Sequence, residues 1–276
     1  MKQAFKIALL IFISTVSLVT SAYGFPSTHP NIIDPTIALQ PHKAIYSITL
    51  KKIREDAQIL NIGGEMFYGL ESSCDGWISD HQFTLFYEYA DNPTLKMTSH
   101  ISAFESYDGS EFNFLTTRKR NGQTYEEIRG HLTNEDTGPT GISVTFTKPE
   151  KQTQTLTQGT LLPTQHTNML LEHAEKGTQY VTLPLFDGTD TDSTRDVSAF
   201  ISTTQDSLHA LKGNGPLYKI DLAFFPQNSK NEQAEYEMTL YIHKSGIIPY
   251  MLIDYGKFTM AQTLKTIKTL PITTCQ

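Results

Sequence analysis

The segment Ala44–Leu50, which reads AIYSITL, indicates the class of fold because its side chains alternate in polarity. Tyr46 and Ile48 fall on one face, and Ser47 and Thr49 fall on the other. A strand with one buried face and one solvated face has this period of two. The same period recurs along most of the chain, so the sequence predicts an all-β protein.

About fourteen segments show strand character, and several are separated by hairpin signals such as Asp108-Gly109 and Asn121-Gly122. An antiparallel meander of this length must curl or close, because flat sheets of more than about ten strands are uncommon. We therefore predict one curled antiparallel sheet with a concave face. Its expected strands are 44–50, 63–70, 83–89, 95–107, 111–119, 123–132, 142–146, 154–157, 179–186, 197–203, 217–225, 236–243, 249–255 and 258–270.

One segment breaks the period of two. Thr164–Lys176 (TQHTNMLLEHAEK) lies between Pro163 and Gly177, with Thr164 as the expected N-cap and Gly177 as the C-terminal cap. We predict one amphipathic helix here, lying on or in the concave face of the sheet. Its expected inner face is formed by residues three and four apart, namely Leu162, His166, Met169, Leu170 and His173.

The first 24 residues have the features of a secretory leader. Two lysines precede the apolar run Ile7–Val19, which is shorter than the roughly 20 residues of a membrane-spanning helix, and Ala22 and Gly24 follow as small residues. We expect cleavage after Gly24, with Ala22 as the alternative, and no transmembrane segment afterwards. Residues 25–276 would then form one domain in the periplasm, since no linker divides them.

The charge of the chain disfavours some partners. Loss of residues 1–24, which hold two lysines and no acid, changes the formal charge from −7 to −9. A protein of that sign is a poor partner for nucleic acid or an anionic membrane. The basic clusters Lys51–Arg54 and Arg118–Arg120 are both expected to be solvated strand ends, the second leading into a turn.

Cys74 and Cys275 are the two cysteines of the sequence. In an oxidising compartment two thiols form a stable disulfide, and the missing CxxC spacing disfavours a redox-switch role. A structural staple is therefore favoured, with intermolecular pairing as the alternative. Trp77, the single tryptophan, is expected to pack as an anchor nearby rather than to stack on a ligand.

Two polar constellations invite a metal-binding interpretation. The alternating acids of Asp187–Asp192 (DGTDTD) resemble a calcium loop, but the EF-hand order and its distal Glu are missing, so a turn set by Asp and Gly is the better account. His166 and His173 share a helix face with Met169 and Leu170 between them, so we expect satisfied histidines rather than metal ligands.

Catalytic and cofactor signatures are missing from the sequence. It contains no HExxH, GxSxG, Walker loop or GxGxxG motif. We therefore expect a protein that is not an enzyme and uses no cofactor.

Aromatic residues crowd two parts of the chain and supply either the core or part of a concave apolar groove. They are Phe67, Tyr68, Phe83, Phe86, Tyr87 and Tyr89, and then Tyr218, Phe224, Phe225, Tyr236, Tyr241, Tyr250 and Tyr255.

Several short motifs together resemble the EipB family of periplasmic cell-envelope integrity proteins from alphaproteobacteria, over about residues 38 to 276. The motifs are Pro41–Tyr46, Cys74-Asp75-Gly76-Trp77, Leu185-Phe186-Asp187-Gly188, Tyr255-Gly256-Lys257-Phe258 and Leu270–Cys275. The resemblance implies a single-domain β-spiral of about fourteen strands, similar to the half-barrel lipoprotein carriers. It also implies a Cys74–Cys275 disulfide and a role in resisting envelope stress, but no activity or ligand.

The hypothesis from sequence is a periplasmic, non-enzymatic protein whose curled sheet binds a lipid or a lipoprotein segment. The alternative is an interaction scaffold that binds an envelope protein through a sheet edge or through the predicted helix. A hydrolase of envelope material is disfavoured for want of a motif.

Overall fold

The computed structural model describes residues 39–54, 58–133, 142–191, 194–204, 209–227 and 233–275. The expected leader, its cleavage site and Asp192 lie outside these residues.

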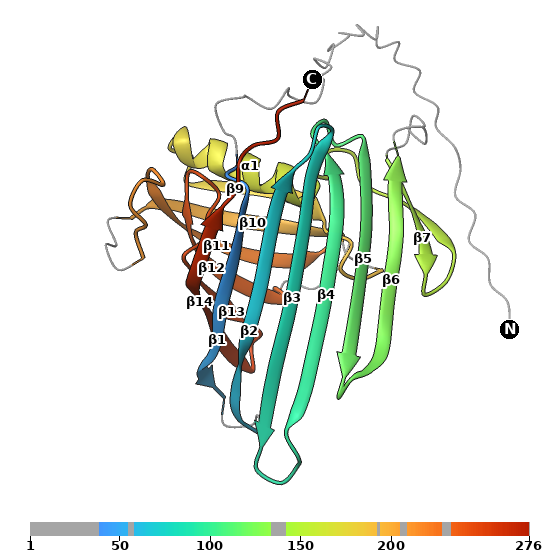
Figure 1. The fold of residues 1–276 in the computed structure, drawn as a ribbon, viewed down its shortest axis with the longest axis vertical. Helices are drawn as coiled ribbons and strands as arrows, with labels where there is room; N and C mark the ends of the chain where they lie inside the picture. Colours follow the sequence, from blue (N-terminus) through green and yellow to red (C-terminus); the bar gives the residue numbers. More distant parts are fainter. Residues whose placement is uncertain are drawn as a thin grey trace, which may run out of the picture. The chain divides into compact units, whose positions relative to one another are not determined.

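Within the described residues, fourteen strands form one antiparallel sheet in the order β8-β7-β6-β5-β4-β3-β2-β1-β14-β13-β12-β11-β10-β9 (Figure 1). The prediction of an all-β protein with a long curled sheet is therefore confirmed. The strands are β1 (His42–Ile53), β2 (Ile59–Ser72), β3 (Gly76–Tyr89), β4 (Leu95–Ser106), β5 (Glu111–Arg120), β6 (Gln123–Thr133), β7 (Ser143–Lys148), β8 (Gln152–Thr155), β9 (Tyr180–Phe186), β10 (Thr194–Thr203), β11 (Leu217–Pro226), β12 (Tyr236–His243), β13 (Tyr250–Asp254) and β14 (Phe258–Thr269).

The sheet consists of two meanders that are joined where the first strand pairs with the last. We call β1–β8 the first wing and β9–β14 the second wing. Strand β1 pairs with β2 on one side and with β14 on the other, from His42↔Thr269 to Ile53↔Phe258. Its inward residues Ala44, Tyr46 and Ile48 are almost completely buried, as the alternating pattern predicts.

The predicted strand boundaries are too short at several places. Strand β3 begins at Gly76, seven residues before the predicted start at Phe83. The missed part, GWISDHQ, mixes polar and apolar residues, but its pairing with β2 and β4 extends the ladder through it. Tertiary pairing therefore overrides a weak local pattern.

The ends of the two wings approach each other without pairing as strands. Leu161, just before the helix, forms a parallel bridge with Leu185 of β9, and its N–H lies 2.8 Å from the carbonyl oxygen of Pro184. The ring of Phe186 packs edge-on at 5.5 Å from the ring of Phe114 on β5 and at 6.0 Å from that of Phe112. These contacts hold the sheet in a curl.

Gly188 follows β9 at the point where the wings meet. Its φ of 67° lies in the left-handed region, and a Cβ there would lie 2.6 Å from Cγ of Phe114. A side chain at this position would therefore push the second wing away from β5.

The helix α1 (Pro163–Glu175) begins one residue earlier than predicted, with Leu162 rather than Thr164 at the N-cap. Proline suits the first helical position because its missing N–H would have no partner there. The free N–H groups of Thr164 and Gln165 donate to the carboxylate of Glu105 on β4, at 2.8 and 2.9 Å. A buried carboxylate from the first wing thus replaces the predicted local cap.

The buried face of α1 also differs from the predicted face. Leu171 is fully buried, whereas Met169 is only half-buried. Leu170 and Leu171 belong to one apolar cluster with Leu70 and Trp77 of the first wing and with residues of β10–β13. The helix therefore connects both wings, near the β2–β3 turn (Figure 1).

Among the described residues, no helix combines the length and the apolar character that a membrane crossing requires.

We predict that Phe186→Ala destabilises the protein by about 3–5 kcal/mol, because it leaves a cavity among the rings that join the wings. Phe86→Ala is the matched control, since that ring is 41% exposed on the other face of the sheet. Its cost should stay below about 1 kcal/mol. Urea denaturation measures both, and equal costs would contradict this account of the curl.

Candidate functional site

A row of aromatic rings crosses the concave face from the second wing to the first. Phe224 stacks on Tyr236 at 4.2 Å, and Tyr236 lies 6.0 Å from Tyr255. Tyr255 lies 5.2 Å from Phe258, which meets Tyr87 of β3 at 6.4 Å. We call these five residues the aromatic row.

The aromatic row is partly accessible to solvent. Phe224 is buried, but Tyr236, Phe258 and Tyr87 are half-buried and Tyr255 is 43% exposed. Burial, with a smaller effect from neighbouring tyrosines, raises the pKa of Tyr87 to about 12. The row is therefore an uncharged, partly open surface. Tyr87 and Phe258 of this row pack on a buried apolar cluster of β1, β2 and β14. The half-buried side chains Leu50, Phe83, Leu85 and Leu264 pack on the same cluster and extend the apolar surface.

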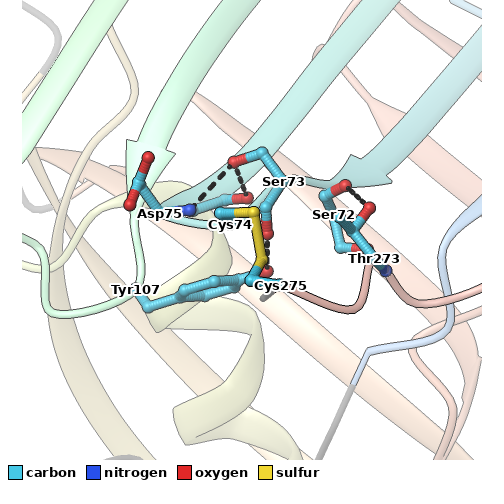
Figure 2. Close-up of a disulfide and its surroundings, with 8 residues drawn as sticks. Ser72, Ser73, Cys74, Asp75, Tyr107, Thr273 and Cys275 are labelled. Atoms are coloured by element: carbon cyan, nitrogen blue, oxygen red, sulfur yellow. Dashed lines mark hydrogen bonds between the residues drawn. A yellow bond between two sulfur atoms is a disulfide. The ribbon is translucent and has the colours of Figure 1, made fainter.

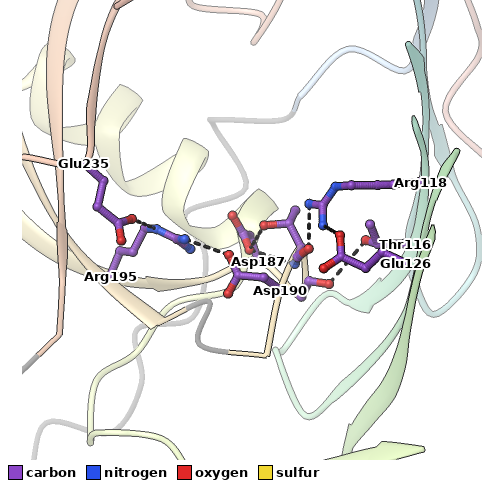
Figure 3. A network of polar contacts seen from close by, with 9 residues as sticks. Thr116, Arg118, Glu126, Asp187, Asp190, Arg195 and Glu235 are labelled. Atoms are coloured by element: carbon purple, nitrogen blue, oxygen red, sulfur yellow. Dashed lines mark hydrogen bonds and ion pairs between the residues drawn. The ribbon is translucent and has the colours of Figure 1, made fainter. Parts of the chain in front are cut away.

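A polar network bridges the two wings beside this row (Figure 3). From the first wing, Arg118 forms an ion pair with Glu126 and donates through Nη2 to the carbonyl oxygen of Thr189 at 2.7 Å. The hydroxyl of Thr116 donates to the carbonyl oxygen of Gly188 at 3.3 Å. The prediction of a solvated strand end is therefore wrong for Arg118, which binds the loop after β9.

Arg195 forms the second-wing part of the network. Its Nε lies 2.7 Å from Glu235 and its Nη2 lies 2.8 Å from Asp190. Burial raises the pKa of Tyr236, and the negative charge of the nearby Asp187 raises it further, whereas the charge of Arg195 opposes the shift. The aromatic row therefore begins at the polar network.

Asp187 forms the turn that the sequence predicts. Its Oδ1 accepts from the N–H of Thr189 at 2.9 Å and from the Thr189 hydroxyl at 2.8 Å. Burial raises the pKa of Asp187, although these two hydrogen bonds oppose that shift. Among the residues that the structure describes, no three potential ligands form a metal-binding cluster.

The C-terminal tail is fastened to the β2–β3 turn (Figure 2). The structure pairs Cys74 with Cys275 as a disulfide, with their Cα atoms 5.6 Å apart, and both residues are exposed. The N–H of Thr273 also donates to the Ser72 hydroxyl at 2.8 Å. The Thr273 hydroxyl donates to the carbonyl oxygen of Ser72 at 2.5 Å, so the tail is held by a covalent bond and two hydrogen bonds.

Trp77 lies at the start of β3, two residues after the turn. It is buried, and its ring meets that of Tyr107 edge-on at 5.6 Å. The Tyr107 hydroxyl donates to the carbonyl oxygen of Ser73 at 2.8 Å. Trp77 thus packs beside the disulfide turn as the sequence predicts.

The helix histidines differ from the expectation of satisfied rings. His166 is buried, and its Nε2 has no hydrogen-bond partner within the described structure. The Nδ1 of His173 likewise lacks one there. Burial lowers the pKa of His166 to about 4, so the ring is neutral at physiological pH.

A groove of about 790 Å³ lies on the outer face of the first wing. Ile78, Phe104 and Leu115 give it apolar walls, and Arg129 and His131 lie at its side on β6. It lies across the sheet from the aromatic row, so it is a separate surface.

Residues 34–271 match the family described as EipB-like. This chain belongs to the EipB-like family. The cell envelope integrity protein EipB of Brucella abortus is 26% identical over 234 residues, which cover 81% of this chain and 82% of that protein. A crystal structure of a β-barrel-like protein of the domain of unknown function DUF1849 from Brucella abortus has a TM-score of 0.78 and 25% identity. That match covers 85% of this chain and all of the other.

Sequence reasoning about this EipB-like chain missed Glu105 and Arg195. Glu105 binds amides about 60 residues later in the chain, and Arg195 binds Glu235, 40 residues later, as well as the nearby Asp190. The partners Glu105–Gln165 and Arg195–Glu235 are too far apart in the sequence to give a local spacing signal. Four of the five residues of the aromatic row lie in the two predicted aromatic segments, whereas Phe258 does not.

We predict that Cys74→Ser lowers the melting temperature by several degrees under oxidising conditions. The disulfide closes a loop of 201 residues, for which chain entropy sets a ceiling of about 5 kcal/mol. Reductant should lower the melting temperature of the wild type to that of the variant. Identical melting of the wild type with and without reductant would sink the idea.

We also predict that His166 makes stability fall in acid. Its pKa is lowered in the folded state from 6.5 to about 4, so the unfolded chain binds more protons between these values. The contribution of the neutral His166 ring to the free energy of unfolding is complete above about pH 6.5 and is lost toward pH 4. Between these pH values, His166→Gln should reduce the slope of the free energy of unfolding against pH by up to about 1.4 kcal/mol per pH unit. Denaturation at pH 8 measures its packing cost separately, and an unchanged slope would contradict the prediction.

Proposed function

We propose that this protein acts in the periplasm, without enzymatic activity, and supports cell-envelope integrity by binding the acyl chain of a lipid or lipoprotein. The partly exposed aromatic row on the concave face is the observation that carries the binding part of this proposal. The name of the Brucella abortus relative supports the envelope part. The leader-like residues 1–24 support export.

The physical basis is burial of apolar surface. Each Å² of apolar area removed from water contributes about 25 cal/mol, and aromatic faces offer large rigid areas. Tyr255 and Phe258 flank the β13–β14 turn, which lies far from α1 in Figure 1. Helix α1 fills the space between the wings near the other end, so the acyl chain of a ligand would enter on the Tyr255 side.

The carboxylates near the site support binding rather than catalysis. Asp187 accepts two hydrogen bonds from Thr189, and Glu105 accepts two from the amides of α1. Both are structural in these contacts. The sequence also contains no GxSxG or HExxH motif.

The alternative function is an interaction scaffold for another envelope protein. The outer groove between Ile78 and Arg129 favours it, because an exposed apolar floor suits a protein partner. Strand β9 ends the sheet, and the part of its outer edge before Pro184, where Leu161 bonds to it, offers a place for an added strand.

Native mass spectrometry of the mature protein, purified gently from periplasm, tests the proposal. We expect excess mass that denaturation releases as lipid or acylated peptide. A bare mass equal to the oxidised chain, together with no uptake of added acyl probes, would reject the carrier function and favour the scaffold. Crosslinking would then capture the partner.

A pair of variants locates the site. Tyr255→Lys should weaken binding of an acyl probe at least about tenfold, because it places a charge in the aromatic row. Tyr180→Lys is the control, since that ring is 64% exposed on the outer face of β9. It should bind as the wild type does. Equal losses would place the ligand elsewhere.

A further inference from the structure

Arg195 faces the concave side at the start of the aromatic row. It shares a face of β10 with Val197 and Ala199, which belong to the core cluster that also contains Phe224. Strand β11 places Phe224 beside Val197, and Phe224 stacks on Tyr236. The guanidinium therefore lies next to the first rings of the row.

One nitrogen of Arg195 is left without a partner. The side chain lies between Glu235 and Asp190, which accept from Nε and Nη2 (Figure 3). Arg195 is only 9% exposed, and its Nη1 is buried and makes no hydrogen bond with the described residues. A buried donor without an acceptor costs free energy that a ligand oxygen would recover.

The charges around Arg195 select the kind of oxygen. Arg118 and Arg195 are the two cations of the polar network, and Glu126, Asp190 and Glu235 are three anions that pair with them. Asp187 adds a further carboxyl group beside Tyr236. These carboxylates would repel an anionic ligand group much more strongly than a neutral carbonyl oxygen.

We propose that the ligand bound on the aromatic row presents a neutral acyl carbonyl, an ester or an amide, whose oxygen accepts a hydrogen bond from Nη1 of Arg195. This inference rests on the proposed function and specifies its ligand. The carbonyl lies at Arg195, and the hydrocarbon chain follows Tyr236, Tyr255 and Phe258 toward Tyr87. Arg195 thus fixes the position of the acyl group.

The test compares two neutral probes that differ by one oxygen, methyl dodecanoate and dodecyl methyl ether. Each displaces N-phenyl-1-naphthylamine, which reports on apolar binding through its fluorescence. We expect the ester to bind about tenfold tighter than the ether, because only the ester offers the carbonyl. Dodecanoate should bind more weakly than the ester at neutral pH, because of its charge.

Two matched variants assign the effect to Arg195. Arg195→Lys keeps the charge but loses the planar group that carries Nη1, so the ester should lose its advantage over the ether. Arg118→Lys makes the same change elsewhere in the network and should keep that advantage. Thermal melting checks that both are folded. If Arg195→Lys does not fold, the comparison of probes on the wild type still decides.

The outcomes separate the inference from the proposed function. Equal binding of ester and ether to the wild type overturns the role of Arg195 and leaves acyl-chain binding in place. No binding of either probe overturns both. Arg195-dependent binding of a short-chain phosphatidylethanolamine or of an N-acylated peptide supports the inference and identifies the source of the acyl group. Binding of both without dependence on Arg195 overturns it.

Discussion

The contact between Phe186 and the phenylalanines of the first wing holds the sheet in its curl, and the site depends on that curl. Strand pairing alone would allow the two wings to lie open, since β8 and β9 are the two edge strands of the sheet and do not pair with each other. Phe186 buries its ring against Phe112, Phe114 and Phe146. The wings therefore face each other, and rings from β3, β11, β12, β14 and the β13–β14 turn meet in one row.

Three kinds of interaction then fix the distance between the wings. The helix α1 packs on both wings, and Glu105 fastens its first turn. The polar network joins β5 to the loop after β9 through Arg118. The disulfide holds the tail against the β2–β3 turn. Each acts at a different place, so the concave face keeps its shape while the aromatic row stays partly open to solvent.

The sequence predicted what local patterns encode. The period of two in 44–50 and its repeats located the strands, and the proline and glycine around 163–177 located the helix. The helix cap was mistaken because its acceptor, Glu105, comes from a strand about 60 residues earlier. Arg118 was placed in solvent for the same reason, since its partner Thr189 lies 71 residues later. Long-range polar contacts leave no periodic signal.

The pairing of β1 with β14 has a consequence for how the chain reaches its folded state. Partners such as Ala44 and Ile267 are separated by most of the chain, so their contact has a very high contact order. A large loop must close before this central ladder can form, and its last strand is also the last to be synthesised. The sheet can therefore be completed only after the whole chain is present in one compartment. An exported chain would cross the membrane before its native sheet is assembled.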